Sequence, residues 1–574
     1  MKKQRRTSEP AAPAATAKPG ANWHWKAALA VLAVVTFEAY SGAFHGAFLL
    51  DDLYLAFMNP DADHLSWRIW LGTRPLLMAT FWLNYQLSGT EPYSYHVVNV
   101  VLHILTGVVI FFLMRWFLEQ AGEQEQRRDL FSTFAAGIFL LHPVQTEAVA
   151  YVASRSDVLC TLLACLSLLV MVRSSQPIRW GRAALVLALF AGAGTAKQQA
   201  VALPVVFLLV DLYRSRDGGW QALKQNWRLH GPVVAGAVLG GGGMLYLLRH
   251  EATAGLTARG VQWYEYFFTQ CRVFWQYVRL LLVPIGLNVD PDVPYSRSLA
   301  EHGAWAGLAA LLALIVFAWV MRRRFPVAAL GVFLSLTMLA PTSSILVIID
   351  PLAERRLYFP MIGFLLVLVD VARRWPPLTG KPAAAVMAVA LAGMGFLTYP
   401  RAAVWGDALA LWRDTAAKSP EKYRPRFQLG FALFQAGRCA EAIPEFAKAA
   451  QLREPNDMLL VDWALALDCA GRPEEAIQRL RQAAELEDTA HIRSLMGMVH
   501  GKQGRNEEGM RELERAIKLN PRYGMAYLYR GNIHAAMGDW GKAREDYRLA
   551  LDCDPGNPAA AQALAMAEQQ LGAR

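Results

Sequence analysis

Up to about Leu397 this chain is dominated by long apolar stretches that are separated by short basic loops. An apolar stretch of about twenty residues can cross a bilayer as a helix. After Trp405 the sequence becomes polar and rich in Ala, Glu and Arg, so the overall values of 55% hydrophobic and 18% charged residues average over two different parts. We therefore expect an all-α chain with a polytopic membrane domain followed by a soluble domain.

About eleven apolar stretches are predicted to be transmembrane helices. They are residues 26–48, 97–117, 130–150, 156–172, 182–195, 199–213, 231–249, 304–321, 326–347, 357–372 and 382–398. Cytoplasmic loops are enriched in Lys and Arg, so the loops at Arg127-Arg128, Arg214 and Arg322 are assigned to the cytoplasm with the basic N-terminus. An odd number of crossings then places the C-terminal domain outside the cytoplasm. The localisation that we expect is the bacterial inner membrane, with multiple crossings, and for such a protein this compartment is the periplasm.

The predicted domains are a disordered basic tail over 1–24, a membrane domain over 25–400 and a periplasmic domain over 401–574. The formal net charge of +10 is interpreted as anchoring beside anionic lipid. No basic stretch is interleaved with aromatic residues, so the bilayer is an expected partner and nucleic acid is not. Within the outer segment 250–303, the aromatic stretch 264–282 predicts an amphipathic helix at the membrane surface. The alternative is another transmembrane helix, which would move the C-terminus into the cytoplasm.

Two adjacent carboxylates, Asp51 and Asp52, follow the first apolar stretch. Alone they are equally compatible with solvated residues at a helix end, because isolated carboxylates are usually exposed. Other polar clusters fall on the same outer side, however: His142-Pro143, Arg155 to Asp157, Lys197, Asp290 to Asp292, Asp350 and Glu354 to Arg356. Polar groups near membrane depth are costly and therefore tend to be functional. Their clustering on one face favours an enzyme site there over a pathway through the membrane.

The soluble domain shows internal repetition with a period of 33 or 34 residues. The repeated positions are Gly437, Gly471, Gly504 and Gly538. This pattern resembles the tetratricopeptide repeat and predicts four repeats over about 424–557 with a capping helix from Pro558. Such arrays bind extended peptides or partner proteins, although a spacer without a ligand is an alternative. Cys439 and Cys469 flank the turns of neighbouring repeats, and an oxidising compartment would permit them to pair.

Further motifs lie on the outer side of the predicted membrane domain. They are Arg74-Pro75-Leu76, the box from His142-Pro143 to Thr146-Glu147-Ala148-Val149, Arg155-Ser156-Asp157, and Ala353-Glu354-Arg355-Arg356-Leu357-Tyr358-Phe359-Pro360. With the twin aspartates and the repeats, they resemble the transmembrane and tetratricopeptide-repeat O-mannosyltransferases and their bacterial relatives, in the GT-C glycosyltransferase superfamily. Two departures are Gln145, where the family usually has His, and Gln198, where it usually has Glu.

The resemblance implies a polyprenyl-phosphate-linked sugar as donor and an inverting transfer to a hydroxyl of an outer-face acceptor. A carboxylate at the membrane edge can take the acceptor proton, so we expect Asp51 to be the base and Asp52 to orient it or share its role. The leaving lipid phosphate stays charged, and the planar guanidinium suits it. Arg355 or Arg356 is the first candidate for binding this phosphate, followed by Arg74 and Arg155.

Four other residues have two interpretations each. His142 either binds sugar or phosphate or is a satisfied imidazole at a His-Pro helix break. Lys197 either contacts the donor phosphate or extends to the interface. Glu354 either helps to bind the donor or forms an internal ion pair with Arg355. Tyr358 packs either on the isoprenoid or, as we favour, on its neighbours.

No metal ion or other cofactor is expected, because no second cluster has ligand spacing and arginines alone can neutralise a phosphate. The lipid-linked sugar is a substrate. The preferred function is transfer of a sugar to periplasmic proteins or peptides that the repeats bind. An alternative keeps this enzyme class but changes the acceptor to a lipid or a surface glycan. A second alternative is a non-catalytic membrane scaffold, whereas a transporter would need more mid-span acids than Glu38.

Overall fold

The computed structural model describes residues 23–573 except for 60–61, 63–64, 69–71, 73, 216–218, 249–253, 256, 259, 345 and 376–381. The chain divides into two compact units. The membrane unit comprises Met1–Pro284 and Tyr295–Ala403, and the repeat unit comprises Ile285–Pro294 and Val404–Arg574. The short segment Ile285–Pro294 therefore groups with the repeats, although it lies within the predicted membrane domain. Most of the tail predicted over 1–24 lies outside the described residues.

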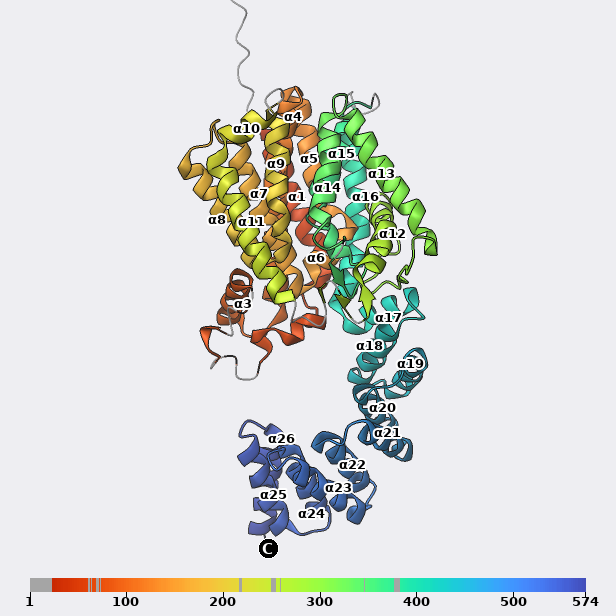
Figure 1. Ribbon diagram of the computed structural model, residues 1–574. Coiled ribbons are helices and arrows are strands. Elements are labelled where there is room, and N and C mark those ends of the chain that lie inside the picture. The colour runs from red at the N-terminus through yellow and green to blue at the C-terminus, as the bar shows by residue number, and fades with distance from the viewer. Residues whose placement is uncertain are drawn as a thin grey trace, which may run out of the picture. The chain divides into compact units, whose positions relative to one another are not determined.

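Each of the predicted apolar stretches contains a helix of the membrane unit, and these helices run side by side as a bundle (Figure 1). They are α1 (Trp23–Tyr40), α4 (Pro92–Gln120), α5 (Glu125–Leu141), α7 (Arg155–Val172), α8 (Trp180–Ala196), α9 (Leu203–Arg214), α11 (Trp227–Leu248), α13 (Ala304–Met321), α14 (Pro326–Leu339), α15 (Met361–Ala372) and α16 (Ala383–Ala403). Helices α1, α4, α7, α13 and α16 are long and apolar enough to cross a membrane, and α8, α14 and α15 are shorter apolar helices. The chain is thus a multi-pass membrane protein, while the count of eleven crossings stays a prediction.

Other elements connect the bundle helices. They include α3 (Pro75–Ser88), α6 (Thr146–Ala150), α10 (Gly219–Gln225), α12 (Trp263–Leu282) and two antiparallel strand pairs, β1 (Ala254–Gly255) with β4 (Val347–Ile348) and β2 (Thr257–Ala258) with β3 (Val261–Gln262). Figure 1 shows α3 at one end of the bundle and α10 at the other. The aromatic stretch predicted to be helical forms α12, which packs on α13.

Three of the predicted transmembrane stretches end earlier than expected. The stretch predicted over 326–347 forms α14, which ends at Leu339. Helix α1 ends at Tyr40 and is followed by the 3₁₀-helix η1 (Ser41–Ala43), so the twin aspartates do not directly follow it. They lie instead in a second 3₁₀-helix, η2 (Leu50–Tyr54). Helix α5 ends at Leu141, because Pro143 lacks a backbone N–H and favours an extended conformation for the residue before it.

Close helix packing holds the bundle together. Helix α4 is buried along much of its length and packs on both α5 and α7. At the contact between α14 and α15, a Cβ atom added at Gly331 would lie 2.4 Å from the carbonyl oxygen of Gly363. Only glycine fits there, and small residues at such positions let helices in membranes approach closely.

The repeat unit is the predicted tetratricopeptide array. Its helices are α17 (Ala408–Lys418), α18 (Tyr423–Gln435), α19 (Cys439–Leu452), α20 (Asp457–Cys469), α21 (Pro473–Leu486), α22 (Ala490–Lys502), α23 (Asn506–Leu519), α24 (Gly524–Ala536), α25 (Trp540–Cys553) and the cap α26 (Pro558–Gly572). The four repeated glycines have φ between 71° and 78°, a left-handed conformation that favours glycine at the turn between paired helices. The all-α fold class is confirmed.

A disulfide and an ion cluster connect segments at the start of the repeat unit. Cys439 and Cys469 form a disulfide with their Cα atoms 5.9 Å apart. The buried carboxylate of Asp290, from the short segment Ile285–Pro294, accepts hydrogen bonds from Lys422 Nζ at 2.5 Å and Arg424 Nε at 2.6 Å. This ion cluster explains why Ile285–Pro294 belongs to the repeat unit.

Candidate active site

The twin aspartates have different surroundings. Asp52 is 1% exposed, and its carboxylate accepts hydrogen bonds from the backbone N–H of Leu49 at 3.0 Å and of Ala153 at 2.7 Å. Asp51 is exposed, and its backbone N–H donates to the Tyr151 hydroxyl at 2.8 Å. Asp52 therefore fixes the η2 turn against the loop before α7, while the Asp51 carboxylate faces solvent.

The same surroundings make Asp52 a weak acid. Burial raises the pKa of Asp52 to about 7, although its two backbone hydrogen bonds oppose this rise. The η2 turn itself starts from Leu50, whose φ of 53° is the left-handed region that non-glycine residues rarely adopt. Strained backbone of this kind persists where surrounding contacts fix it, and it is common at functional sites.

A buried ion pair joins α6 to the 3₁₀-helix η9 (Glu354–Leu357). The carboxylate of Glu147 accepts the backbone N–H of Arg355 at 3.0 Å and also pairs with its guanidinium. Glu147 is fully buried, whereas the Arg355 side chain remains 26% exposed. Arg355 also interacts electrostatically with Tyr151 and Asp157. Glu147 thus orients Arg355 while part of the Arg355 side chain stays exposed.

A second ion pair lies between α7 and the end of α8. Lys197 Nζ is 2.5 Å from Asp157 Oδ2, and the Asp157 side chain is almost fully buried. Arg74 and Arg355 both interact electrostatically with Lys197. The pairing with Asp157 was not predicted, and it means that Lys197 does not simply extend to the membrane interface.

Arg155 and Arg356 donate their hydrogen bonds to the protein interior. Arg155 is fully buried and donates to Asn99 Oδ1 at 2.8 Å and the Tyr95 carbonyl at 3.0 Å. Arg356 is 6% exposed and donates to the carbonyls of Asp350 at 2.5 Å and Pro351 at 3.0 Å. Both guanidinium groups therefore connect elements of the fold, and neither presents an open face to a phosphate.

His142 is a satisfied imidazole in this structure. Its Nδ1 accepts the Val144 N–H at 3.2 Å, so its Nε2 must carry the proton that is donated to the Leu281 carbonyl at 3.0 Å. This arrangement matches the helix-break interpretation rather than a ligand-binding one.

Tyr358 and Glu354 also have internal partners. The Tyr358 hydroxyl is 2.7 Å from His103 Nδ1 and its side chain is fully buried, so it packs on its neighbours. Glu354 is buried with its carboxylate 3.8 Å from Arg401 Nη2. The predicted alternative of an ion pair between Glu354 and Arg355 is wrong, because each of the two has a different partner.

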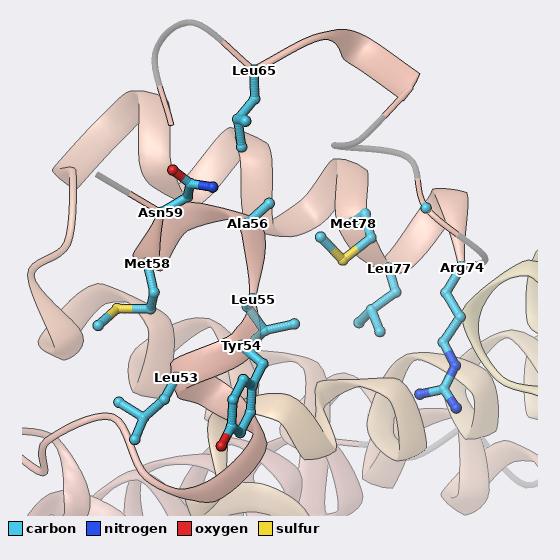
Figure 2. A pocket seen from close by; sticks show the side chains of 11 residues that line it. Leu53, Tyr54, Leu55, Ala56, Met58, Asn59, Leu65, Arg74, Leu77 and Met78 are labelled. Carbon is cyan, nitrogen blue, oxygen red and sulfur yellow. The ribbon is translucent and has the colours of Figure 1, made fainter. Parts of the chain in front are cut away.

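An open pocket of about 560 Å³ begins at the residue after the twin aspartates (Figure 2). Its lining is mainly apolar: Leu53, Tyr54, Leu55, Ala56, Met58, Asn59, Leu65, Gly72, Arg74, Leu77 and Met78. Arg74 is the only cation among these lining residues, and in Figure 2 its guanidinium and the Tyr54 hydroxyl both point away from Leu65. Among the described residues nothing forms a hydrogen bond or ion pair with this guanidinium.

The structure thus brings several of the predicted site residues into one electrostatic network. Its members are Asp51, Asp52, Arg74, Arg155, Lys197 and Arg355, together with Glu147, Tyr151 and Asp157. Glu147 and Asp157 were present in the sequence motifs but had no predicted role, and Tyr151 lies between those two motifs. The signal for Glu147 and Asp157 was an acid in the same motif as other polar site candidates. Across the described ranges, no group of three His, Cys, Asp or Glu side chains has the arrangement of a metal site.

Gln145, one of the departures from the family pattern, is fully buried within this region. Neither of its amide atoms has a hydrogen-bond partner among the described residues. A buried amide without partners is costly, so the substitution of Gln for the usual His is not explained by any contact of its side chain.

Comparisons with known proteins agree with both parts of the chain. A family model described as a tetratricopeptide repeat matches residues 494–558. The chain is 23% identical over 573 residues to the Mus musculus protein O-mannosyl-transferase TMTC3. The matched region covers 87% of this chain and 58% of that protein. The Homo sapiens protein O-mannosyl-transferase TMTC1 is 25% identical over 491 residues, covering 74% of this chain and 55% of that protein.

The chain is similar to the protein O-mannosyl-transferases. This similarity confirms the resemblance predicted from the motifs, and the chain spans only 58% and 55% of the length of these two relatives. Among solved structures, YrrB, described as a TPR protein with an unusual peptide-binding site, is 20% identical with a TM-score of 0.24. It covers 33% of this chain and 95% of its own length.

Proposed function

We propose that this chain is a membrane glycosyltransferase that moves a sugar from a polyprenyl phosphate to a hydroxyl of a protein outside the cytoplasm. The proposal depends mainly on the exposed Asp51, which shares an electrostatic network with Arg355. Asp51 also lies two residues before Leu53, the first residue of the pocket that contains Arg74. The similarity to protein O-mannosyl-transferases supports this reaction class and makes mannose the first sugar to test.

Asp51 is the proposed base. It is the exposed member of the pair, whereas both carboxylate oxygens of Asp52 already accept backbone hydrogen bonds. Asp51 would accept the proton of the acceptor hydroxyl while that oxygen attacks the anomeric carbon and the carbon–phosphate-oxygen bond breaks. Attack on the face opposite the leaving phosphate inverts the anomeric configuration. Asp52 acts as a positioning residue for the η2 turn.

Arg74 and Arg355 are the proposed phosphate-binding residues. Arg74 has no carboxylate partner within the described part of the chain, and Arg355 keeps 26% of its side chain exposed despite its ion pair. Guanidinium groups with accessible N–H donors stabilise the charge that stays on a leaving phosphate. The apolar lining of the adjoining pocket suits a substrate that also carries apolar groups.

The repeat unit is proposed to bind the acceptor protein outside the cytoplasm, in the periplasm of a bacterial cell. The disulfide between Cys439 and Cys469 supports an oxidising compartment, because cytosolic thiols are usually kept reduced. The basic loops assign the opposite ends of the membrane helices to the cytoplasm. Metal ions are not part of the proposed mechanism.

The test compares periplasmic proteins by mass spectrometry from cells with and without this chain. The expected result is a set of proteins that lose a hexose-type mass when the chain is absent. Asp51→Asn is expected to lower transfer by about 10²- to 10⁴-fold, the usual contribution of a positioned general base. Glu91→Gln is the matched control, since Glu91 is an exposed acid at the start of α4 and is expected to keep wild-type activity.

Three outcomes would contradict all or part of the proposal. Full transfer by the double variant Asp51→Asn/Asp52→Asn, at normal expression, would reject the assigned base. Loss of function on removal of the repeats, with no effect of neutralising Asp51 or Arg355, would indicate the scaffold alternative instead. A lost hexose on lipids or surface glycans, with proteins unchanged, would keep the enzyme class but change the acceptor.

A further inference from the structure

The repeat unit contains one acid whose environment differs from that of its other acids. Asp462 lies in the middle of α20 and is half-buried. Within the described repeat unit, no side chain or backbone group forms a hydrogen bond or ion pair with its carboxylate. Burial raises the pKa of Asp462 to about 6, so the group is still mostly ionised at neutral pH. A half-buried carboxylate without a cation is unfavourable.

Other acids of the same unit show that this arrangement is not general. Asp468, which follows Asp462 along α20, pairs with Lys502 at 2.8 Å. Asp546 of α25 is also buried and is held by Arg530 at 2.6 Å. The repeats contain many arginines, and yet none of those in the described repeat unit forms an ion pair with Asp462.

Asp462 lies on an uncovered face of α20. Met458, Asp462 and Leu465 follow the i, i+4, i+7 spacing of a single helix face. Met458 is 57% exposed and Leu465 is partly exposed, whereas Leu459, Trp463 and Leu467 on the other side are buried against the neighbouring helices. This face therefore combines an apolar border with a single unpaired negative charge.

The uncovered face continues to the previous repeat. Asp462 interacts electrostatically with Tyr423 at the start of α18, and so does Arg453, whose guanidinium lies 5.4 Å from the centre of the Tyr423 ring. Helix α18 packs against α20. The Tyr423 ring stacks on Phe427 with a centroid distance of 5.9 Å. The first helices of two successive repeats thus form one surface, with an aromatic ring on one side of the carboxylate and Met458 on the same helix.

We infer that this surface binds an extended segment of the acceptor protein through a lysine or arginine side chain that pairs with Asp462. The inference rests on the proposed function in one respect, which is that the bound protein is the acceptor of the sugar. Charge complementarity selects the cation, and Tyr423 and Met458 would pack on its aliphatic stem. The acceptor is therefore a protein with a basic residue in the segment bound by the first two repeats.

The test measures peptide binding by the full-length chain in nanodiscs, using fluorescence anisotropy. Three labelled eleven-residue Ala/Ser peptides differ only at the central position, which is Lys, Ala or Glu. The wild-type chain is expected to bind the Lys peptide about tenfold more tightly than the Ala peptide, as for one partly buried charge pair. Asp462→Asn is expected to remove this preference, and Asp462→Lys to shift it to the Glu peptide. Asp468→Asn on the same helix is the matched control and is expected to keep the preference for Lys.

Equal affinity for the three peptides, no detectable binding of the Lys peptide at millimolar concentration, or a Lys preference that persists in Asp462→Asn would each overturn the inference. Circular dichroism of each variant checks that the helices remain folded, and the conservative Asn variant decides the question should the Lys variant fail to fold. Binding is measured without donor sugar. A Lys preference in a chain that transfers no sugar would therefore remove the proposed function alone.

Discussion

Removing either partner of the ion pair between Glu147 and Arg355 is expected to lower stability, but by different amounts. Glu147 is fully buried, whereas the Arg355 side chain is 26% exposed. Arg355→Met leaves a buried carboxylate without its cation, which is expected to cost about 3–5 kcal/mol of unfolding free energy. Glu147→Gln leaves a cation that reaches water and keeps an acceptor for the Arg355 backbone N–H. It is expected to cost less, about 1.5–3 kcal/mol, the usual value of one hydrogen bond to a charged group.

The double variant completes a thermodynamic cycle. Glu147→Gln/Arg355→Met is expected to be more stable than Arg355→Met alone, because it leaves no unpaired buried charge, with a coupling energy of about 2–3 kcal/mol. The assay is unfolding of the full chain in mixed micelles by titration with sodium dodecyl sulfate, followed by circular dichroism. Arg74→Gln is the control and is expected to change stability by less than about 0.5 kcal/mol, because the Arg74 guanidinium has no partner among the described residues.

Two results would refute this reasoning. One is a larger cost for Glu147→Gln than for Arg355→Met, because it would mean that the buried carboxylate is not the group that depends on the pair. The other is a coupling energy that does not differ from zero, because the two side chains would then contribute independently.

Two further predictions concern Asp52 and the disulfide. The raised pKa of Asp52, about 7 in the fold, means that the folded chain keeps a proton which the unfolded chain loses near pH 4. Stability is therefore expected to fall as pH rises from about 4 to 7, by up to about 4 kcal/mol, and unfolding midpoints of Asp52→Asn should lack this dependence. The disulfide closes a loop with a sequence separation of 30, so Cys439→Ser/Cys469→Ser is expected to destabilise the repeats by about 3 kcal/mol in chemical denaturation, with Cys553→Ser unchanged. A stability difference between the wild-type chain and Asp52→Asn that does not change with pH would contradict the first prediction. Equal stability of the double cysteine variant and Cys553→Ser would contradict the second.

Helix positions were largely predictable because they depend on local chemistry. Apolar stretches indicated each bundle helix, and the period of the glycines indicated the repeats and their turns. Errors occurred at the ends of stretches. The run that includes Phe48 is apolar yet not α-helical beyond Tyr40, because hydrophobicity reports burial and does not by itself define where a helix ends. The assignment of the segment Ile285–Pro294 to the repeat unit depends on Asp290, whose cations lie more than a hundred residues away in the sequence.

The roles of the basic residues were not predictable in the same way. Arg356 and Arg74 both follow from motifs, but only the tertiary structure shows that Arg356 donates to buried carbonyls whereas Arg74 stays without a partner in the described chain. The same holds for Lys197, whose partner Asp157 is on another helix. A guanidinium has the same chemistry in every motif, and its availability depends on which distant atoms already accept its hydrogen bonds.

The sequence by itself determined that this chain crosses a membrane many times, that it ends in a helical repeat array, and that acids and arginines gather in a few motifs. These properties follow from apolar length, repeat period and residue type, all of which are local. Only the tertiary structure decided that Asp51 is exposed beside a buried Asp52, that Glu147 orients Arg355, and that Asp462 lacks a cation. The physical reason is that burial and pairing are properties of contacts between segments far apart in the chain, and these contacts set the charge, pKa and accessibility on which chemistry depends.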